Sequence, residues 1–132
     1  MDKKLDLIVS KTKKTSYHRT LHPTTTNEVI RIGKNIDKDE ADYEFIGIAY
    51  FSSEGANTLK KIYDDCSQHS TGKFHEAESF DKAAITDIIQ EIIDRGFTVN
   101  ALEVYKGWME IHNPKDVKIA EKEIVQEQEA SA

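Results

Sequence analysis

The pattern of apolar and polar positions predicts its best strand between Tyr43 and Phe51, a stretch rich in isoleucine and aromatic residues. Apolar side chains occupy both alternating sets of positions there, which is typical of a central strand in a sheet that is covered on both faces. Weaker patterns predict a short strand at Leu5 to Val9, a strand and turn within Asn27 to Ile36, and a strand at Phe97 to Tyr105.

Two segments have the apolar spacing of helices that cover a sheet. Between Ala83 and Arg95 the isoleucines recur at helical intervals, and Gly96 follows where a left-handed C-cap would lie. Another helix is expected after Ser52 or Ser53, since either serine can act as its N-cap. Strands that alternate with helices predict an α/β fold, a mixed sheet flanked by helices. The apolar positions of the helix after the serines are Ala56, Leu59, Ile62, Tyr63 and Cys66.

The last predicted helix has the most explicit start signal. Asn113 is a good N-cap, Pro114 suits the first helical position, and Asp116 at the third position can bond back to the cap. The final residues, QEQEASA, are expected to fray. The apolar residues expected to face inward are Val117, Ala120 and Ile124.

The length of the chain indicates how many domains it forms, and its net charge argues against some kinds of binding partner. A chain of 132 residues fits one domain, so residues 1–132 are expected to form a single domain. The net charge of −6 argues against binding to nucleic acid or to an anionic membrane surface, because phosphate groups would be repelled. The sequence has no apolar run of the ~18 residues that span a bilayer and no signal-peptide pattern, so a cytoplasmic location is expected. Cys66 is expected to be a small core residue.

The segment from Gly107 to His112 is the first candidate site. As a strand it would place Trp108, Glu110 and His112 on one face, so that a large ring, a carboxylate and an imidazole point the same way. The alternative is an ordinary strand-to-helix junction in which Glu110 is solvated and Trp108 packs.

The polar stretch from Tyr17 to Thr26 is the second candidate. No regular element fits it, and Pro23 disfavours a helix, so an exposed loop is expected. Arg19 can clamp a phosphate or phosphonate with its fork of donors, with His22 as a helper. The alternative is that both are solvated loop residues. A metal pair of His18 and His22 is not favoured, because no third ligand lies nearby.

Six short motifs, taken in order, resemble a known family and span nearly the whole chain. They resemble the C-terminal half of nucleotidyltransferase domains of the type associated with phosphoenolpyruvate phosphomutase and with phosphonate or phosphocholine cytidylylation. The GWMEIHNPKDVKIA stretch also resembles the end of the catalytic domain in that family, where a tryptophan precedes an acidic residue and a T-P-E-D-L helix start. The motifs are RTLHP from Arg19, IGK from Ile32, EFIG from Glu44, FSSEG from Phe51, DIIQEIIDRG from Asp87 and GWMEI from Gly107.

The resemblance implies a Rossmann-like half-domain that binds the acceptor in nucleotide transfer, CMP being the expected nucleotide. A phosphate or phosphonate oxygen would attack the α-phosphorus of the nucleotide, and pyrophosphate would leave. The implied cofactor is Mg²⁺, held by Glu110, and the implied catalytic residues are Glu110 and His112. The implied substrate-binding residues are Arg19, His22, Glu44, Gly47 and Trp108.

Two departures from the family pattern limit these expectations. The sequence contains no loop of the form L-A-A-G-x-G-x-R, which wraps the nucleotide in such enzymes. His112 stands where the family can have an acidic residue, and magnesium prefers oxygen ligands, so the metal role is assigned to Glu110. Whether the chain alone is an enzyme therefore stays open.

Three further outcomes follow from these departures. The chain could be a catalytically inert domain for a small anion or a partner, or one subunit of a split enzyme whose N-terminal half is on another chain, or it could self-associate. An incomplete sheet should leave Leu5 to Val9, or Tyr43 to Phe51, with unpaired backbone and bare isoleucine.

Overall fold

The computed structural model of the chain describes residues 5–10, 19–21, 28–37, 39–104 and 111–131. In 5–10 and 19–21 only the backbone is described. The elements are β1 (Leu5–Ser10), β2 (Arg19–Leu21), β3 (Arg31–Gly33), β4 (Tyr43–Phe51), α1 (Ser53–His69), the short 3-10 helix η1 (Phe80–Lys82), α2 (Ile85–Asp94), β5 (Val99–Val104) and α3 (Pro114–Ser131).

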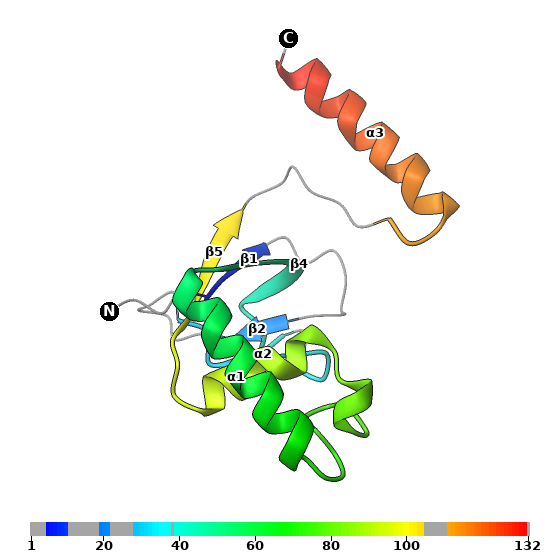
Figure 1. The fold of residues 1–132 in the computed structure, drawn as a ribbon. Coiled ribbons are helices and arrows are strands. Elements are labelled where there is room, and N and C mark those ends of the chain that lie inside the picture. The colour runs from blue at the N-terminus through cyan, green and yellow to red at the C-terminus, as the bar shows by residue number, and fades with distance from the viewer. Residues whose placement is uncertain (1–4, 11–18, 22–27, 38, 105–110, 132) are drawn as a thin grey trace.

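The strands form one mixed sheet in the order β3-β2-β4-β1-β5, of which Figure 1 labels β2, β4, β1 and β5. β1 runs antiparallel to β4 and parallel to β5, while β2 runs antiparallel to both β3 and β4. The predicted α/β class with a mixed sheet flanked by helices is confirmed. The central place and the bounds of the Tyr43–Phe51 strand are also confirmed.

The sequence named Leu5 to Val9 or Tyr43 to Phe51 as a free strand edge, and the described strands exclude the first of these alternatives. β1 lies between β4 and β5, so the prediction that Leu5 to Val9 would be an open edge is wrong. On the other side of β4, however, β2 pairs only with Tyr43 and Glu44. Among the strands that the structure describes, none lies beside residues 46–51 on that edge of β4.

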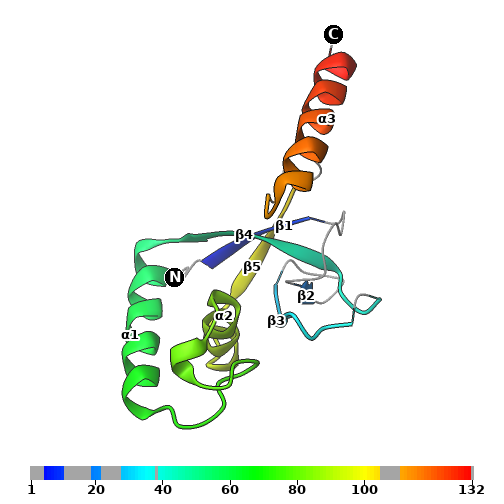
Figure 2. The same cartoon turned by 90° about the vertical axis from the view of Figure 1, so that its right-hand side faces the viewer.

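One face of the sheet is covered by α1 and α2, and the core lies between them and the strands (Figure 2). α2 presents Ile88, Ile89 and Ile92 to the core. Burial of each of these side chains stabilises the folded state by about 2 kcal/mol. The other buried members of the core are Val29, Ile32, Tyr43, Phe45, Ile62, Cys66, Phe74, Val99 and Ala101.

The caps of α1 and α2 follow the sequence signals closely. Ser52 is the N-cap of α1, and its Oγ accepts a hydrogen bond of 3.0 Å from the backbone N–H of Gly55. α2 begins at Ile85, two residues later than predicted, because Asp87 Oδ2 accepts the backbone N–H of Ala84 at 2.8 Å. Gly96 follows α2 with φ of 91°, the left-handed conformation that its position predicts.

Residues Arg19–Leu21 are a strand, so the prediction of an irregular loop throughout Tyr17 to Thr26 is wrong at these three positions. Two neighbouring strands, β3 and β4, supply backbone partners that short-range sequence signals do not reveal. The remaining residues of that stretch, including His18 and His22, lie outside the described part of the chain.

The start of α3 uses the predicted cap with one change of partner. Asn113 Oδ1 accepts the backbone N–H of Asp116 at 3.0 Å. Asp116 Oδ2 in turn accepts the N–H of His112 at 2.8 Å, one residue before the cap. Ile111 and His112 belong to no strand, so the alternation predicted through His112 is wrong for these two residues. Residues 107–110 lie outside the described part.

α3 does not bury its apolar side, contrary to the prediction. Figures 1 and 2 show α3 standing away from the sheet, on the side opposite α1 and α2. The helix continues to Ser131, and the fraying of its last residues stays a prediction. None of the described helices is long and apolar enough to cross a membrane. The large apolar residues that α3 exposes are Val117, Ile119, Ile124 and Val125.

Candidate functional site

The two faces of the sheet differ in how far their side chains are exposed to solvent. Register places Ile48 of β4, Ile8 of β1 and Leu102 of β5 in one row, and residues in one row share a face. The exposed fractions are 56% for Ile48, 55% for Leu102 and 61% for Tyr50, which lies two residues along β4 on the same face. We call this side, opposite α1 and α2, the open face. The prediction that β4 is covered on both faces is therefore wrong along its second half.

β4 contains a bulge in the middle of the open face. Ile8 pairs with Ile48 while the next residue, Val9, pairs with Phe45, so Ile46 and Gly47 have no partners on β1. Gly47 has φ of 91°, a conformation that residues with a Cβ adopt only with strain. It is exposed, and a Cβ there would meet nothing within 4 Å. Glycine is therefore needed for the bend of the backbone, and the bend leaves that backbone accessible.

Glu44 lies beside this bulge, and its side chain is buried on the same side of the sheet as Ile48. It pairs with Ser10, which lies two residues from Ile8 on β1, so Glu44 and Ile48 point to the same side. Its exposed fraction is only 1%, which is unusual for a glutamate and costly unless the charge is well bonded. On β2, the residue opposite Glu44 is Arg19. The register therefore brings three predicted substrate-binding positions, Arg19, Glu44 and Gly47, to one part of the sheet.

The remaining candidates are placed as follows. His22, Trp108 and Glu110 lie outside the described residues, so the predicted cluster of Trp108, Glu110 and His112 stays a prediction. His112 is exposed at the entry to α3, and its backbone N–H is bound to Asp116. The predicted convergence of Glu110 and Gly47 on one cavity is likewise not tested.

A polar network that sequence reasoning missed joins α1, α2 and the loop before η1. Arg95 donates from Nε to Glu91 and from Nη2 to Asp65, both at 2.8 Å. His75 Nε2 lies 2.8 Å from the other oxygen of Glu91. His75 has φ of 51°, a strained value for a residue with a Cβ, so this network also holds a strained loop. The i, i+4 spacing of Glu91 and Arg95 is visible in the sequence, whereas the bonds to Asp65 and His75 are tertiary.

The network shifts the acidity of its carboxyl groups. Burial by itself would raise the pKa of Glu91, but hydrogen bonds from Arg95 and His75 outweigh burial and hold that pKa below its usual value. The hydrogen bond from Arg95 likewise lowers the pKa of Asp65. On the sheet, burial and a hydrogen bond of 2.9 Å donated to Glu103 raise the pKa of Tyr43.

The lowered pKa of Glu91 makes the stability of the chain depend on pH. The bonded Glu91 carboxylate contributes to the free energy of unfolding. This contribution is fully present above the usual glutamate pKa of 4.5 and is lost as the pH falls through the lower pKa of the folded state. We expect Glu91→Gln to lose less of its free energy of unfolding than the wild type between about pH 6 and pH 3, as measured by urea denaturation. The control Glu54→Gln, an exposed glutamate of α1, should keep the wild-type pH dependence. If the free energy of unfolding changed equally with pH in the wild type and in Glu91→Gln, the lowered pKa of Glu91 would be contradicted.

The turn after β3 explains the glycine of the IGK motif. The backbone N–H groups of Lys34 and Asn35 donate to the two oxygens of Glu76 at 2.8 and 3.0 Å. Glycine at position 33 leaves room for the Glu76 carboxylate beside the turn. This contact ties the end of β3 to the loop before η1.

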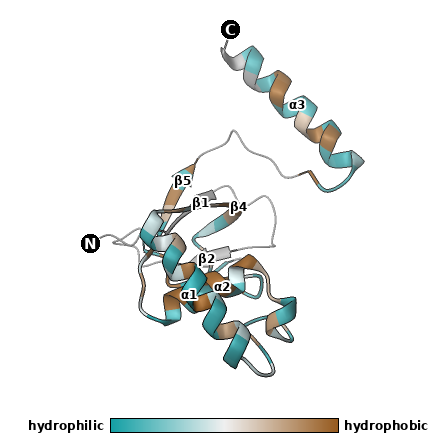
Figure 3. Ribbon diagram, viewed as in Figure 1, coloured by the Kyte–Doolittle hydropathy of each residue, from teal (hydrophilic) through white to brown (hydrophobic). Residues whose placement is uncertain are grey.

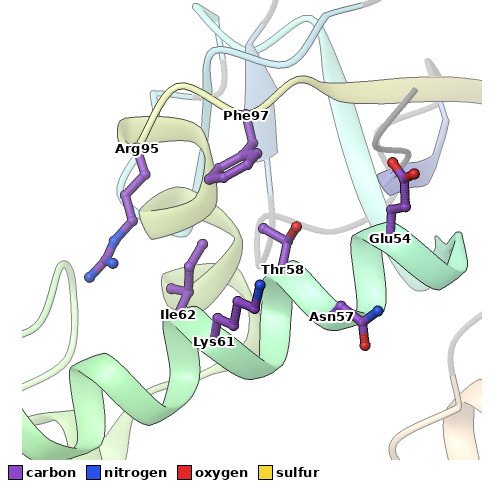
Figure 4. A pocket seen from close by; sticks show the side chains of 7 residues that line it. All are labelled: Glu54, Asn57, Thr58, Lys61, Ile62, Arg95 and Phe97. Atoms are coloured by element: carbon purple, nitrogen blue, oxygen red, sulfur yellow. The ribbon is translucent and has the colours of Figure 1, made fainter. Parts of the chain in front are cut away.

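A cavity of about 540 Å³ lies on the helix-covered side, between α1 and the turn after α2 (Figure 4). In Figure 4 the ring of Phe97 extends toward α1, whose side chains line the opposite wall. Neither Glu44 nor Gly47 lines this cavity, so it is separate from the open face. Its lining residues are Glu54, Asn57, Thr58, Lys61, Ile62, Arg95 and Phe97.

The described residues do not assemble a metal site. Within residues 28–37, 39–104 and 111–131, no group of three His, Cys, Asp or Glu side chains is arranged to hold a metal ion. Glu110, the predicted magnesium ligand, lies outside these ranges.

No family model and no curated protein matches the chain, but its fold is found in solved structures. The structure of the inositol-1-phosphate CTP transferase from T. maritima has a TM-score of 0.59 and 22% sequence identity, over 88% of this chain and 42% of that chain. The nucleoside-diphosphate-sugar pyrophosphorylase from Vibrio cholerae RC9 has a TM-score of 0.66 and 13% identity, over 88% of this chain and 45% of that chain.

These likenesses establish the fold. At 22% and 13% identity, the shared property is the path of the backbone, which is that of part of a nucleotidyltransferase domain. The chain spans less than half the length of either protein. The expected half-domain of a nucleotidyltransferase is thus confirmed at the level of fold.

Proposed function

We propose that the chain is the acceptor-binding portion of a nucleotidyltransferase, which transfers CMP to a small phosphate or phosphonate with release of pyrophosphate. One observation carries this proposal. In a sheet with the fold of part of a nucleotidyltransferase domain, a buried carboxylate, Glu44, lies beside the accessible bulge at Gly47. The likeness to a CTP transferase supports the choice of nucleotide.

The chemistry of Glu44 defines which end of the acceptor it would bind. An ionised carboxylate only accepts hydrogen bonds, and it repels a phosphate or phosphonate group. Glu44 would therefore accept from an ammonium or hydroxyl group at the other end of the acceptor. Arg19, opposite Glu44 in the register, would clamp the anionic end with His22 as helper. The accessible backbone at Gly47 would let the ligand approach the strand.

Transfer of this kind needs little covalent chemistry from the protein, because positioning and charge stabilisation provide most of the acceleration. Magnesium, which the family resemblance implies, would neutralise negative charge on the phosphate oxygens of the nucleotide when bound. The described residues do not offer a ligand set that fits it, and we assign no step to the metal. Trp108, Glu110 and His112 stay candidates for the wall of the site and for catalysis.

A conservative change at Glu44 tests the proposal. Glu44→Gln keeps the size of the side chain but removes its charge, and a hydrogen bond to a charged group contributes about 1.5–3 kcal/mol. We expect affinity for 2-aminoethylphosphonate, phosphocholine or inositol 1-phosphate, whichever binds the wild type most tightly, to fall roughly tenfold or more in calorimetric titration.

The matched control for this experiment is Glu54→Gln, which removes a carboxylate from the cavity on the helix-covered side. It should leave the affinity unchanged, and thermal unfolding of both variants should show that they are folded. If affinity fell in Glu54→Gln and not in Glu44→Gln, the acceptor would bind in that cavity and not beside Glu44. Failure of all three compounds to bind would reject the proposal.

A second candidate is a subunit of a split enzyme or a catalytically inert binding domain. It is favoured by the lack of a glycine-rich nucleotide loop in this sequence. It predicts acceptor binding without turnover by the chain alone.

A further inference from the structure

A second cavity, of about 680 Å³, lies on the helix-covered side between α1 and the segment that runs from η1 into the start of α2. The described residues that line it lie between 59 and 88, within a stretch that the structure describes without a gap. It shares no described lining residue with the cavity beside Phe97, and neither Glu44 nor Gly47 lines it. We call it the η1 cavity.

The wall of the η1 cavity is mainly apolar and partly open to solvent. Tyr63 is 53% exposed and Ile85 is 47% exposed, although both are large apolar residues. Figure 3 shows apolar segments, coloured brown, where α1 and α2 lie side by side. Cavities of about 300–1,000 Å³ with an apolar wall and a few polar groups are typical sites for small molecules. The apolar residues of the wall, alanines aside, are Leu59, Tyr63, Phe80, Ile85 and Ile88.

Two aromatic rings form a fixed corner in this cavity. The ring centres of Tyr63 and Phe80 lie 5.3 Å apart, and the ring planes are inclined by 59°. Phe80 also packs edge-on against the buried ring of Phe74, with the ring centres 5.1 Å apart, which anchors the corner to the core. The face of an aromatic ring is negative and attracts a cation that lies within about 6 Å of its centre. The corner therefore favours a cationic ligand over an anionic one.

The charged side chains at the η1 cavity also favour a cation. Asp64 of α1 and Asp81 of η1 both line the cavity, and neither carboxylate forms an ion pair with a described residue. Lys60 is the basic residue among the described lining residues, so two negative charges and one positive charge leave a net charge of −1. The long stem of Lys60 can carry its ammonium group into solvent, away from a bound cation.

We propose that the η1 cavity binds a small organic cation with an apolar or aromatic body. The ammonium group of the ligand lies near Asp64 and Asp81, and its apolar body packs on the rings of Tyr63 and Phe80. A phosphate or phosphonate group would be repelled by the two carboxylates, so this ligand differs in chemistry from the proposed acceptors. The site is separate from the one proposed at Glu44, and neither proposal depends on the other.

An NMR titration of the isotopically labelled full chain with 2-phenylethylammonium tests the proposal. We expect saturable shifts of the backbone amides of Tyr63, Asp81 and Ile85, and no comparable shift at Gly47. The uncharged 2-phenylethanol should bind about two- to fivefold more weakly, because it lacks the attraction to the carboxylates. The anion 3-phenylpropanoate should bind more weakly still. Equal binding of the cation and the anion, or no saturable shift with the cation, would overturn the proposal.

Charge variants test which groups select the cation. Asp64→Asn and Asp81→Asn keep the size of the side chain, and each should weaken binding of 2-phenylethylammonium by about two- to fivefold. Lys60→Gln removes a like charge and should strengthen binding. The matched control Asp39→Asn, an exposed aspartate outside the cavity, should change nothing, and thermal melts check that all variants are folded. Unchanged affinity in both cavity aspartate variants, or weaker binding in Lys60→Gln, would reject a cation site.

The ring of Tyr63 is tested separately. Tyr63→Leu keeps an apolar side chain at an exposed position, so the variant should fold. Loss of the ring should reduce the preference for 2-phenylethylammonium over 2-phenylethanol, because the leucine side chain has no negative face. If the variant kept the wild-type preference, the aromatic corner would have no part in binding the cation.

Discussion

Purified alone, the chain is expected to release no measurable pyrophosphate from CTP in the presence of phosphocholine or 2-aminoethylphosphonate. Its sequence contains no glycine-rich loop to hold the nucleotide, and its described residues assemble no metal site. Electrostatic groups of this kind each contribute about 100-fold to 1000-fold to the rate. A coupled assay for inorganic pyrophosphate measures the effect.

The control for that assay is a complete nucleotidyltransferase, such as the inositol-1-phosphate CTP transferase, measured under the same conditions with its own acceptor. Robust turnover by the chain alone would contradict the view that it supplies only the acceptor side.

The largest expected effect on stability is at Ile89, which is fully buried between α2 and the sheet. Ile89→Ala removes apolar atoms and leaves a cavity, and changes of this type cost about 2–5 kcal/mol. Because α2 packs against β3 and α1 around the core, this loss should approach the whole stability of a small domain. Urea denaturation followed by circular dichroism measures the free energy of unfolding.

Ile85 provides the matched control, since it is the same residue type in the same helix but is 47% exposed. Ile85→Ala should change the free energy of unfolding by less than about 1 kcal/mol. Similar losses for the two variants would mean that α2 does not pack on the sheet through Ile89.

Local signals predicted much of this fold because they act within a few residues. Ser52 caps α1 through a bond to Gly55, and Gly96 adopts the left-handed conformation after α2. The apolar run of β4 fixed the bounds of the central strand. In each case the determining contact or conformation lies within the element or next to it.

The sequence could not reveal which apolar surfaces are covered. The apolar side of α3 has the same pattern whether it packs on its own sheet or on another polypeptide, and the same holds for Ile48 and Tyr50. The short strand β2 depends on two distant strands for its pairing. The bonds of His75 and Asp65 to the Arg95 network are also tertiary, so no spacing predicts them.

The candidate site stays a prediction. The family resemblance indicated Glu44 and Gly47, which belong to the same strand, β4, next to its bulge. The burial of Glu44 could not be predicted, because it depends on what surrounds the strand and not on the motif. Trp108 and Glu110 stay predictions.

The most direct test of acceptor binding on the open face is an NMR titration of the isotopically labelled chain with 2-aminoethylphosphonate. We expect saturable shifts of the backbone amides of Glu44 and Gly47, and no comparable shifts at Thr58 and Phe97 in the cavity on the helix-covered side. Shifts at Thr58 and Phe97 without shifts at Glu44 and Gly47 would contradict the claim that the open face binds the acceptor.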